Sequence, residues 1–350
     1  MRDGIVCFNV ALGRIGVLVL CVALCVGGLS TSTSAITGAK ATYVTFAVPN
    51  AVQTTGGSIN NNGYIAGWTM DASKRNHGLL RAPDGTITIF DVAGAEDTFS
   101  NSMNSTNVIT GAYFDGHFYE HGFVRAADGT ITTFDPSGSI ETFPTSINDA
   151  GVIVGSYVDL SERTHGFLRS ADGTFTIFDV QGVTETLPQC INNEGAVTGY
   201  AENGSLADTH GFLRAASGTI TTFDAPGSMR TQPTGINNPG VIDGFYVDAS
   251  GVFHGFVRAA DGTITSFDPP GSTGTNTYGV NDQGTILGVY VDSNLVLHGF
   301  ARAASGRAVS FDPPGSTYTQ PLGLNNHNAI TGGYNKGGST QYGFLLTVKH

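Results

Sequence analysis

A phrase of fifteen residues, His165 to Asp179 with the sequence HGFLRSADGTFTIFD, recurs along most of the chain. Period-two alternation on both sides of Asp172-Gly173, with β-branched and aromatic residues on both arms, predicts a β-hairpin. Copies of its first arm begin at His77, His121, His165, His210, His254, His298 and Tyr342, at intervals of 44, 44, 45, 44, 44 and 44 residues. A period of this length, with several short strands in each unit, indicates a propeller or a solenoid.

Each unit contains four strand-like segments joined by short turns or by a Pro/Gly-rich connection. We name them A, a short strand that ends in Asn; B, a strand that ends in Tyr-x-Asp; C, the His-Gly-Phe arm; and D, the threonine-rich arm that ends in Phe-Asp. Because the connections are short, neighbouring strands should pair antiparallel. We expect strand A to be innermost and strand D outermost.

The turn between strands A and B has two restricted positions. Its fourth residue is always Gly or Asn, the two residues that best tolerate a left-handed backbone, and its leading Asn can cap the turn with its side chain. The leading residues are Asn60, Asn104, Asn148, Asn192, Asn237, Asn281 and Asn325, and the fourth residues are Gly63, Asn107, Gly151, Gly195, Gly240, Gly284 and Asn328. We interpret this repetition as backbone chemistry rather than as a functional site.

The two ends of the repeat array distinguish a ring from a solenoid. Tyr43 to Ala47 is a D-type arm with no C arm before it, and Tyr342 to Leu346 is a C-type arm with no D arm after it. In a closed ring the N-terminal strand would complete the last unit and remove an open sheet edge. The two arms also share their departures from the pattern, since Ala47 replaces Asp and Tyr342 and Leu346 replace His and Arg. Fraying of terminal repeats is the alternative.

The sequence therefore predicts an all-β fold, a seven-bladed β-propeller of 44-residue four-stranded repeats in which the N-terminal strand completes the last blade. The phrases His-Gly-Phe-x-Arg and Ile-Asn-x-x-Gly-x-Ile-x-Gly-x-Tyr resemble the bacterial extracellular repeat called HAF, and the blade pattern is similar to that of WD-type and kelch propellers. The resemblance covers residues 43 to 350, with Gly where that family has Ala. It implies export and repetition, and it implies no particular activity.

The first 41 residues differ in composition from the rest. Arg2 and Arg14 precede an apolar run from Ile15 to Val26, and small residues follow around Ala35 and Ala41. The run is shorter than the roughly 20 residues that span a bilayer. We predict a signal peptide at residues 1–41, cleaved after Ala35 or Ala41, and a propeller at residues 42–350 that is secreted or periplasmic. An uncleaved membrane anchor is the alternative.

The charge balance is acidic. The whole chain has 16 basic and 28 acidic residues, and removal of the first 41 residues leaves 13 and 27, a net charge of −14. No basic stripe is present, which excludes binding to nucleic acid through phosphate neutralisation. We expect a monomer that contacts a membrane only if the signal peptide is uncleaved, and whose partner is an extracellular ligand or protein.

Antiparallel alternation places the A–B and C–D turns on one face and the B–C loops and D–A connections on the other. The first face hardly varies between units, whereas the second does, which makes the second the expected place for binding. Each D–A connection carries a Thr preceded by a variable residue, which is acidic in three consecutive units. The candidate ligand-binding residues on this face are Asp97, Glu141, Glu185, Arg230, Tyr278 and Tyr318.

The three carboxylates leave three hypotheses open. They are a solvated acidic rim, a cation or ligand site, or an acid/base pair with the spacing that glycosidases use. We expect no cofactor, with a divalent cation such as calcium as the alternative.

His and Asp recur together as Tyr-x-Asp-x5-His, for example in Asp159 with His165 and in Asp248 with His254, and both are lost in the last unit. One His and one carboxylate in each unit are too few for zinc, which needs three or four ligands. We predict that each pair forms a structural contact at the base of the B–C loop.

No Gly-x-Ser-x-Gly, His-Glu-x-x-His or phosphate-loop motif is present. The predicted function is that of a secreted β-propeller binding module for a glycan, a cation or a protein. The alternative is a secreted glycan-active hydrolase or lyase that uses the carboxylates of the variable face, so the sequence leaves enzymatic activity undecided.

Overall fold

The computed structural model describes residues 40–204 and 208–349, which form 28 β-strands and no α-helix. None of these residues belongs to a helix long and apolar enough to cross a membrane. The predicted all-β class is thus confirmed. The predicted signal peptide lies outside the described residues, except for Lys40 and Ala41, which already belong to the first strand.

The strands follow the predicted order A, B, C, D. The A strands are β2 (Gln53–Ile59), β6 (Asp97–Met103), β10 (Ser139–Ile147), β14 (Glu185–Ile191), β18 (Ser228–Ile236), β22 (Gly274–Val280) and β26 (Tyr318–Leu324). The B strands are β3 (Ile65–Met70), β7 (Ile109–Phe114), β11 (Ile153–Asp159), β15 (Val197–Glu202), β19 (Ile242–Asp248), β23 (Ile286–Val291) and β27 (Ile330–Asn335).

The C strands are β4 (Asn76–Arg81), β8 (Glu120–Arg125), β12 (Thr164–Arg169), β16 (His210–Arg214), β20 (Phe253–Arg258), β24 (Leu297–Arg302) and β28 (Gln341–Lys349). The D strands are β5 (Ile87–Phe90), β9 (Ile131–Phe134), β13 (Phe175–Phe178), β17 (Ile220–Phe223), β21 (Ile264–Phe267) and β25 (Ala308–Phe311). The remaining strand is β1 (Lys40–Phe46).

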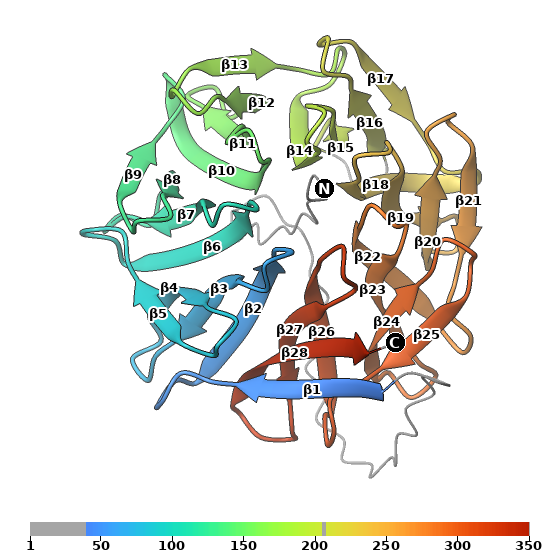
Figure 1. Cartoon of the computed structure of the whole chain (residues 1–350). Coiled ribbons are helices and arrows are strands. Elements are labelled where there is room, and N and C mark those ends of the chain that lie inside the picture. The colour runs from blue at the N-terminus through green and yellow to red at the C-terminus, as the bar shows by residue number, and fades with distance from the viewer. Residues whose placement is uncertain (1–39, 205–207, 350) are drawn as a thin grey trace.

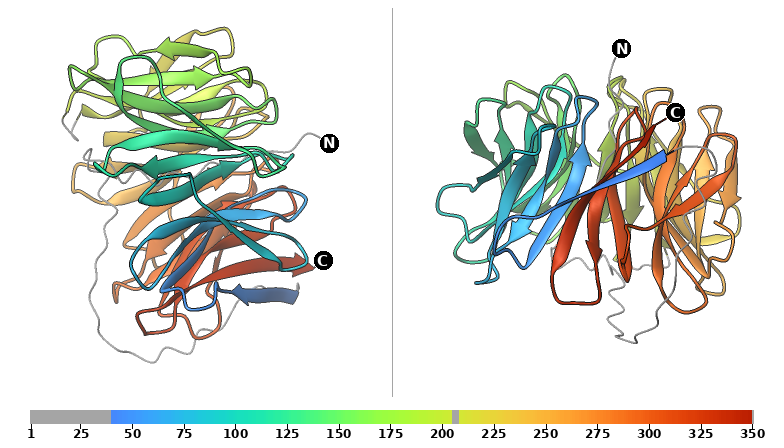
Figure 2. Two further views of the ribbon diagram at one scale, coloured as in Figure 1. Left: turned by 90° about the vertical axis from the view of Figure 1, so that its left-hand side faces the viewer. Right: turned by 60° about the horizontal axis from the view of Figure 1, so that its bottom comes forward.

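Consecutive strands of one unit pair antiparallel, as β10, β11, β12 and β13 do. The sheets are arranged around a centre, with the A strands nearest to it and the D strands outermost (Figure 1). Most pairs of neighbouring sheets are separate, and three pairs are joined by single parallel bridges, Thr164 with Glu185, Gln53 with Gln341 and Thr209 with Arg230. The two side views show that the turns lie at two opposite faces (Figure 2).

The A–B turns have the predicted geometry. The fourth residue is left-handed in every unit, with φ of 79° at Gly63 and 64° at Asn107. The leading Asn caps the turn, since Asn60 Oδ1 accepts hydrogen bonds from the backbone nitrogens of Asn62 and Tyr64 at 3.1 Å each. Both predictions for this turn are confirmed.

The same Asn residues also link neighbouring units, which the sequence did not predict. Each side chain donates from Nδ2 to the backbone oxygen of the corresponding Asn in the next unit, at 2.9 to 3.3 Å. The series runs through Asn60, Asn104, Asn148, Asn192, Asn237, Asn281 and Asn325 and returns from Asn325 to Asn60 at 3.0 Å. All seven residues are buried.

A second set of contacts joins the outer parts of the units. The C-strand Phe of one unit packs edge-on against the D-strand Phe of the unit before it, as Phe123 does against Phe90 with 6.1 Å between ring centroids. The Arg that follows, Arg125, lies over the same Phe90 ring at 4.8 Å. The repeated Phe and Arg of the hairpin therefore hold units together, through aromatic packing and cation–π contacts.

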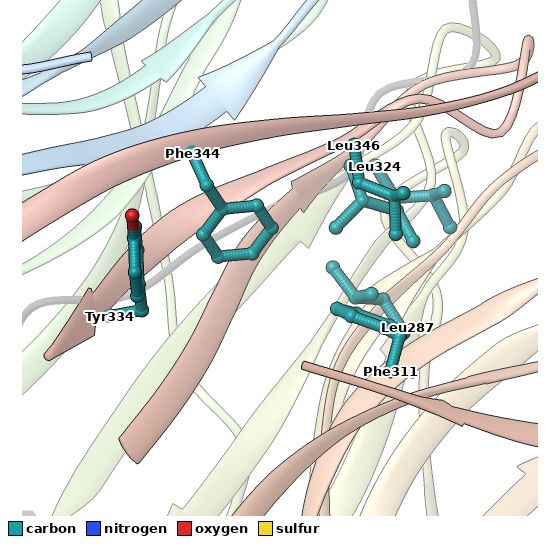
Figure 3. Close-up of a cluster of buried hydrophobic side chains, with 7 residues drawn as sticks. Leu287, Phe311, Leu324, Tyr334, Phe344 and Leu346 are labelled. Carbon is teal, nitrogen blue, oxygen red and sulfur yellow. The ribbon is translucent and has the colours of Figure 1, made fainter. Parts of the chain in front are cut away.

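The last unit keeps the aromatic contact, with Phe344 edge-on against Phe311 at 6.4 Å between ring centroids, and replaces the Arg contact by apolar packing (Figure 3). Leu346 stands in the position of Arg and belongs to a buried cluster with Phe311, Leu324 and Phe344. Next to this cluster, β1 pairs with β28 antiparallel, in register from Lys40 with Lys349 to Phe46 with Gly343 (Figure 1).

The Asn series predicts a stability effect that can be measured. Asn148→Ala removes the cap of the turn and the link to Asn192, and we expect it to lower the free energy of unfolding by about 2 to 3 kcal/mol, because buried partners are left unsatisfied. The control is Asn294→Ala in an exposed B–C loop, expected within about 0.5 kcal/mol of the wild type. Equal effects in denaturant unfolding would contradict the account.

Candidate functional site

The variable face is formed by the B–C loops and the D–A connections, and we call it the loop face. The two kinds of segment touch each other, since Arg75 Nη2 in the first B–C loop donates to the backbone oxygen of Ala95 in the following D–A connection at 2.7 Å. The two kinds of segment are therefore neighbours on this face, and five of the six candidate ligand-binding residues, all but Tyr278, lie at or near the start of an A strand.

At several junctions the variable residue before the Thr contacts the neighbouring unit. Its partner is the residue before the His of the preceding C strand. Asp97 Oδ1 accepts hydrogen bonds from Asn76, from the backbone nitrogen at 2.6 Å and from Nδ2 at 2.9 Å. Glu185 forms a parallel bridge with Thr164. These predicted residues thus contact the scaffold of the neighbouring unit.

At the next junction the amide is replaced by a second carboxylate. Glu120 occupies the position of Asn76, lies beside Glu141, and is only 2% exposed. Its Oε2 accepts no hydrogen bond from the described residues. Burial, and in second place the charge of Glu141, raises the pKa of Glu120 to about 8. Its protonated form is therefore favoured relative to that of a solvent-exposed Glu.

A second carboxylate pair lies within the fourth unit. Glu185 and Glu202 are direct cross-strand neighbours on β14 and β15. Burial, followed by the charge of Glu202, raises the pKa of Glu185. Glu202 accepts a hydrogen bond from Thr209 Oγ1 at 2.7 Å and interacts electrostatically with Arg230. The sequence did not single out Glu120 or Glu202, because both stand at positions held by other residue types in the other units.

The two aromatic candidates have different surroundings. Tyr318 donates from its hydroxyl to Gln320 Oε1 at 2.9 Å on the same strand. Tyr278 is the extra residue of a β-bulge in β22, between Thr277 and Gly279, and it packs against a buried cluster that contains Trp68 and Leu322. The described residues contain no group of three or more His, Cys, Asp or Glu side chains that could hold a metal ion.

The Thr shared by all D–A connections is part of the scaffold. All seven copies are at most 1% exposed. Thr186 Oγ1 accepts a hydrogen bond from the backbone nitrogen of Val180 at 3.1 Å, and Thr142 donates to Asp135 Oδ1 at 2.6 Å. The repeated residue of the connection therefore fixes the path of the chain.

The predicted contacts between His and Asp are present. His165 Nε2 lies 3.2 Å from Asp159 Oδ2, and His254 Nε2 lies 3.5 Å from Asp248 Oδ2. A second carboxylate, from the Phe-Asp pair of strand D, was not predicted as a partner: His165 Nδ1 lies 3.0 Å from Asp179. Burial lowers the pKa of His165, but the hydrogen bonds to the two carboxylates outweigh it and raise the pKa overall. The structural role of these pairs stays a prediction.

The fourth unit keeps the same arrangement with a different residue. Its sequence has Asn203 at the usual Asp position, and Asp208 supplies the carboxylate instead, 3.1 Å from His210 Nε2. The imidazole is held on its other side by Asp224 at 2.9 Å. Six units therefore carry a His between two carboxylates on the loop face.

A cleft of about 560 Å³ opens on the loop face between the first D–A connection and the first B–C loop. One wall is apolar and includes Val48 and Pro49, and the polar groups are Asp71, His77 and Asp91. His77 Nδ1 lies 2.9 Å from Asp91 Oδ1. The volume is within the range of small-ligand pockets, and the cleft is open to solvent over much of its extent. The sequence did not predict the cleft, because the residues that line it repeat or vary as they do in other units.

No family model and no curated protein matches the sequence. Among solved structures, one of two prolyl endopeptidases is similar with a TM-score of 0.60 and 10% identity over 86% of this chain and 51% of that chain. The fold is propeller-like. TolB from Acinetobacter baumannii gives a TM-score of 0.48 with 13% identity over 82% of this chain and 81% of that one. The BP39L lectin from Burkholderia pseudomallei gives 0.49 with 9% identity over 82% and 96%. Identities this low concern the fold alone, so function must be argued from the residues.

The Glu120–Glu141 junction predicts a pH effect. Because folding raises the pKa of Glu120 from 4.5 to about 8, its contribution to stability is complete below about pH 4.5 and is lost as the pH rises towards 8. Glu120→Gln removes this loss and provides an amide donor, as Asn76 does for Asp97. We expect the melting temperature of the variant to exceed that of the wild type at about pH 8.5 by more than at about pH 5. A difference that does not change with pH would contradict a protonated Glu120.

Proposed function

We propose that this chain is an exported seven-bladed β-propeller, closed by its N-terminal strand, that binds an extracellular ligand on the loop face. The observation that carries the binding function is the cleft beside Asp71, His77 and Asp91. It combines an apolar wall with converging polar groups, the composition typical of small-ligand sites.

Three contacts support closure of the ring. Strand β1 pairs along its length with β28 and so takes the D position of the last unit. Asn325 donates to Asn60 as every other Asn of the series donates to its neighbour. Arg81 lies over the ring of Phe46 at 5.3 Å, the contact that Arg125 makes with Phe90 between the first two units. The last and first units are thus joined as internal units are.

Export is proposed from the leader sequence and fits the extent of β1. Cleavage after Ala35 leaves β1 whole, whereas cleavage after Ala41 removes Lys40 and Ala41, which pair with Lys349 and Val348. We therefore favour cleavage after Ala35.

The enzyme alternative receives less support. Two carboxylate pairs exist, Glu120 with Glu141 and Glu185 with Glu202, in which burial raises the pKa of Glu120 and of Glu185. In the first pair Glu120 is 2% exposed and in the second Glu202 is 6% exposed, so one carboxylate of each pair is packed inside the scaffold. Neither pair lines the cleft. General acid–base catalysis requires contact with the substrate, which favours binding over hydrolysis.

If a ligand binds in the cleft, a side chain that fills the cleft should abolish binding. A thermal-shift screen against soluble glycans and divalent cations should give at least one compound that raises the melting temperature. Ala72→Trp adds a large side chain to the lining of the cleft, and we expect it to abolish that shift.

The matched control is Ala249→Trp, since Asp248-Ala249-Ser250 repeats the sequence Asp71-Ala72-Ser73 in another unit. It should bind as the wild type does. If no compound raises the melting temperature, or if both variants keep the shift, the cleft is not a ligand site.

Ring closure predicts that Phe46 is as important as an internal D-strand Phe. Phe46 is 7% exposed and Phe134 is 8% exposed. We expect Phe46→Ala and Phe134→Ala each to lower the free energy of unfolding by about 3 to 5 kcal/mol. A near-neutral Phe46→Ala beside a strongly destabilising Phe134→Ala, in urea unfolding, would show that β1 is not part of a closed ring.

A further inference from the structure

The A–B turns and the B–C turns are built alike. In both, the leading residue accepts a backbone hydrogen bond from the fourth residue, Asn60 from Gly63 at 3.0 Å and Asp71 from Lys74 at 3.1 Å. The leading side chain caps both turns: Asp71 Oδ1 accepts from the backbone nitrogens of Ser73 and Arg75 at 2.8 and 3.0 Å. The two kinds of turn therefore make the same demand on their fourth residue.

The type of residue at this fourth position differs between the two faces. In the A–B turns it is always Gly or Asn. In the B–C turns a positive φ is held by Lys74 (74°), Phe118 (64°), Glu162 (60°), Gly251 (81°) and Leu295 (63°). Bulky residues are unfavourable in the left-handed region, so Phe118 and Leu295 are strained where Gly would be relaxed. Strain of this kind is typical of functional positions.

These strained side chains contribute little to the core of the fold. Phe118 is 73% exposed and Leu295 is 69% exposed, and Leu160, in the B–C turn of the third unit, is 82% exposed. Tyr119, Met229 and Val252 are also exposed large apolar residues of the loop face. Among the described residues, no A–B or C–D turn exposes a large apolar side chain; the other exposed ones lie on the outer strands β1, β5 and β13. The exposed apolar side chains of the turns, which we call the apolar tips, are thus confined to one face.

The distribution of the tips fits a large partner. Phe118, Tyr119 and Leu160 belong to the second and third units, and Val252 and Leu295 belong to the fifth and sixth. The loops of different units surround the centre of the molecule (Figure 1). A small ligand in one cleft cannot cover both groups, whereas a protein surface can.

The charge around the tips indicates the chemistry of that partner. Each B–C turn with an apolar tip begins with an Asp, and the six C-strand His residues are each held between two carboxylates that remain partly exposed, such as Asp115 (33%) and Asp135 (36%). The chain as a whole has a net charge of −12. Apolar tips set among carboxylates complement a basic surface with apolar side chains, and they are repelled by an anionic lipid surface.

We infer that the loop face docks a basic protein surface through the apolar tips Phe118, Leu160 and Leu295. This inference rests on the proposed function, because it assigns the partner of the same face. The tips act as anchors that are buried on binding, and the surrounding carboxylates select a cationic partner.

The test uses defined probes. A fluorescently labelled amphipathic peptide made of Lys and Leu is titrated with the whole protein, and binding is followed by fluorescence anisotropy. A peptide of the same pattern made of Glu and Leu, and vesicles of phosphatidylcholine with phosphatidylglycerol, are titrated in parallel. The variant carries Phe118→Asn, Leu160→Ser and Leu295→Asn. Asn tolerates the left-handed position, so we expect a melting temperature equal to or above that of the wild type.

The inference expects the Lys/Leu peptide to bind the wild type and to bind the variant about tenfold or more weakly. The control with Val44→Thr and Ile177→Thr, which removes exposed apolar residues from outer strands, should bind as the wild type does. Three results would overturn the inference: equal binding by the tip variant, equal binding of the Glu/Leu peptide, or vesicle binding that depends on the tips. A compound that binds in the cleft while the Lys/Leu peptide does not would leave the proposed function intact and reject this partner.

Discussion

The structure depends on one side chain used seven times, the Asn that leads each A–B turn. Its Oδ1 caps the turn of its own unit and its Nδ2 reaches the backbone of the next unit. In every unit the partners include backbone groups, and Asn60 and Asn281 donate in addition to the side-chain oxygens of Asn107 and Asn328 at 2.8 and 2.9 Å. The amide is the group that can accept and donate in this geometry. This explains why the position admits no substitution among the seven copies.

Because the Asn series fixes the face of the A–B turns, the loop face can vary. The residues before the shared Thr differ from unit to unit, yet where contacts are recorded they meet a matching residue of the neighbouring C strand, as Asp97 meets Asn76 and Gly274 approaches Phe253. The residue type at this position thus depends on packing between units as well as on any ligand contact. The B–C turns hold the strained and exposed residues Phe118 and Leu295.

The architecture could be predicted from the sequence because the repeats expose it: strand order, antiparallel pairing and the left-handed turn residues follow from patterns that recur in each unit. The links between units could not, because an Asn that caps a turn and an Asn that also reaches a neighbour look the same in sequence. Among the candidate residues, comparison of units found the variable Glu141 but not its buried partner Glu120, which lies 21 positions earlier on another strand. The cleft depends on how two loops approach, which no local pattern encodes.

The central claim is that repeated positions hold the fold while the loop face carries the function. Hydrogen–deuterium exchange of the wild type with and without the Lys/Leu peptide tests it most directly. The account predicts added protection in the B–C turns around Phe118, Leu160 and Leu295 and in the adjoining D–A connections, and unchanged exchange in the A–B and C–D turns. Protection confined to the A–B and C–D turns, or spread equally over both faces, would contradict it.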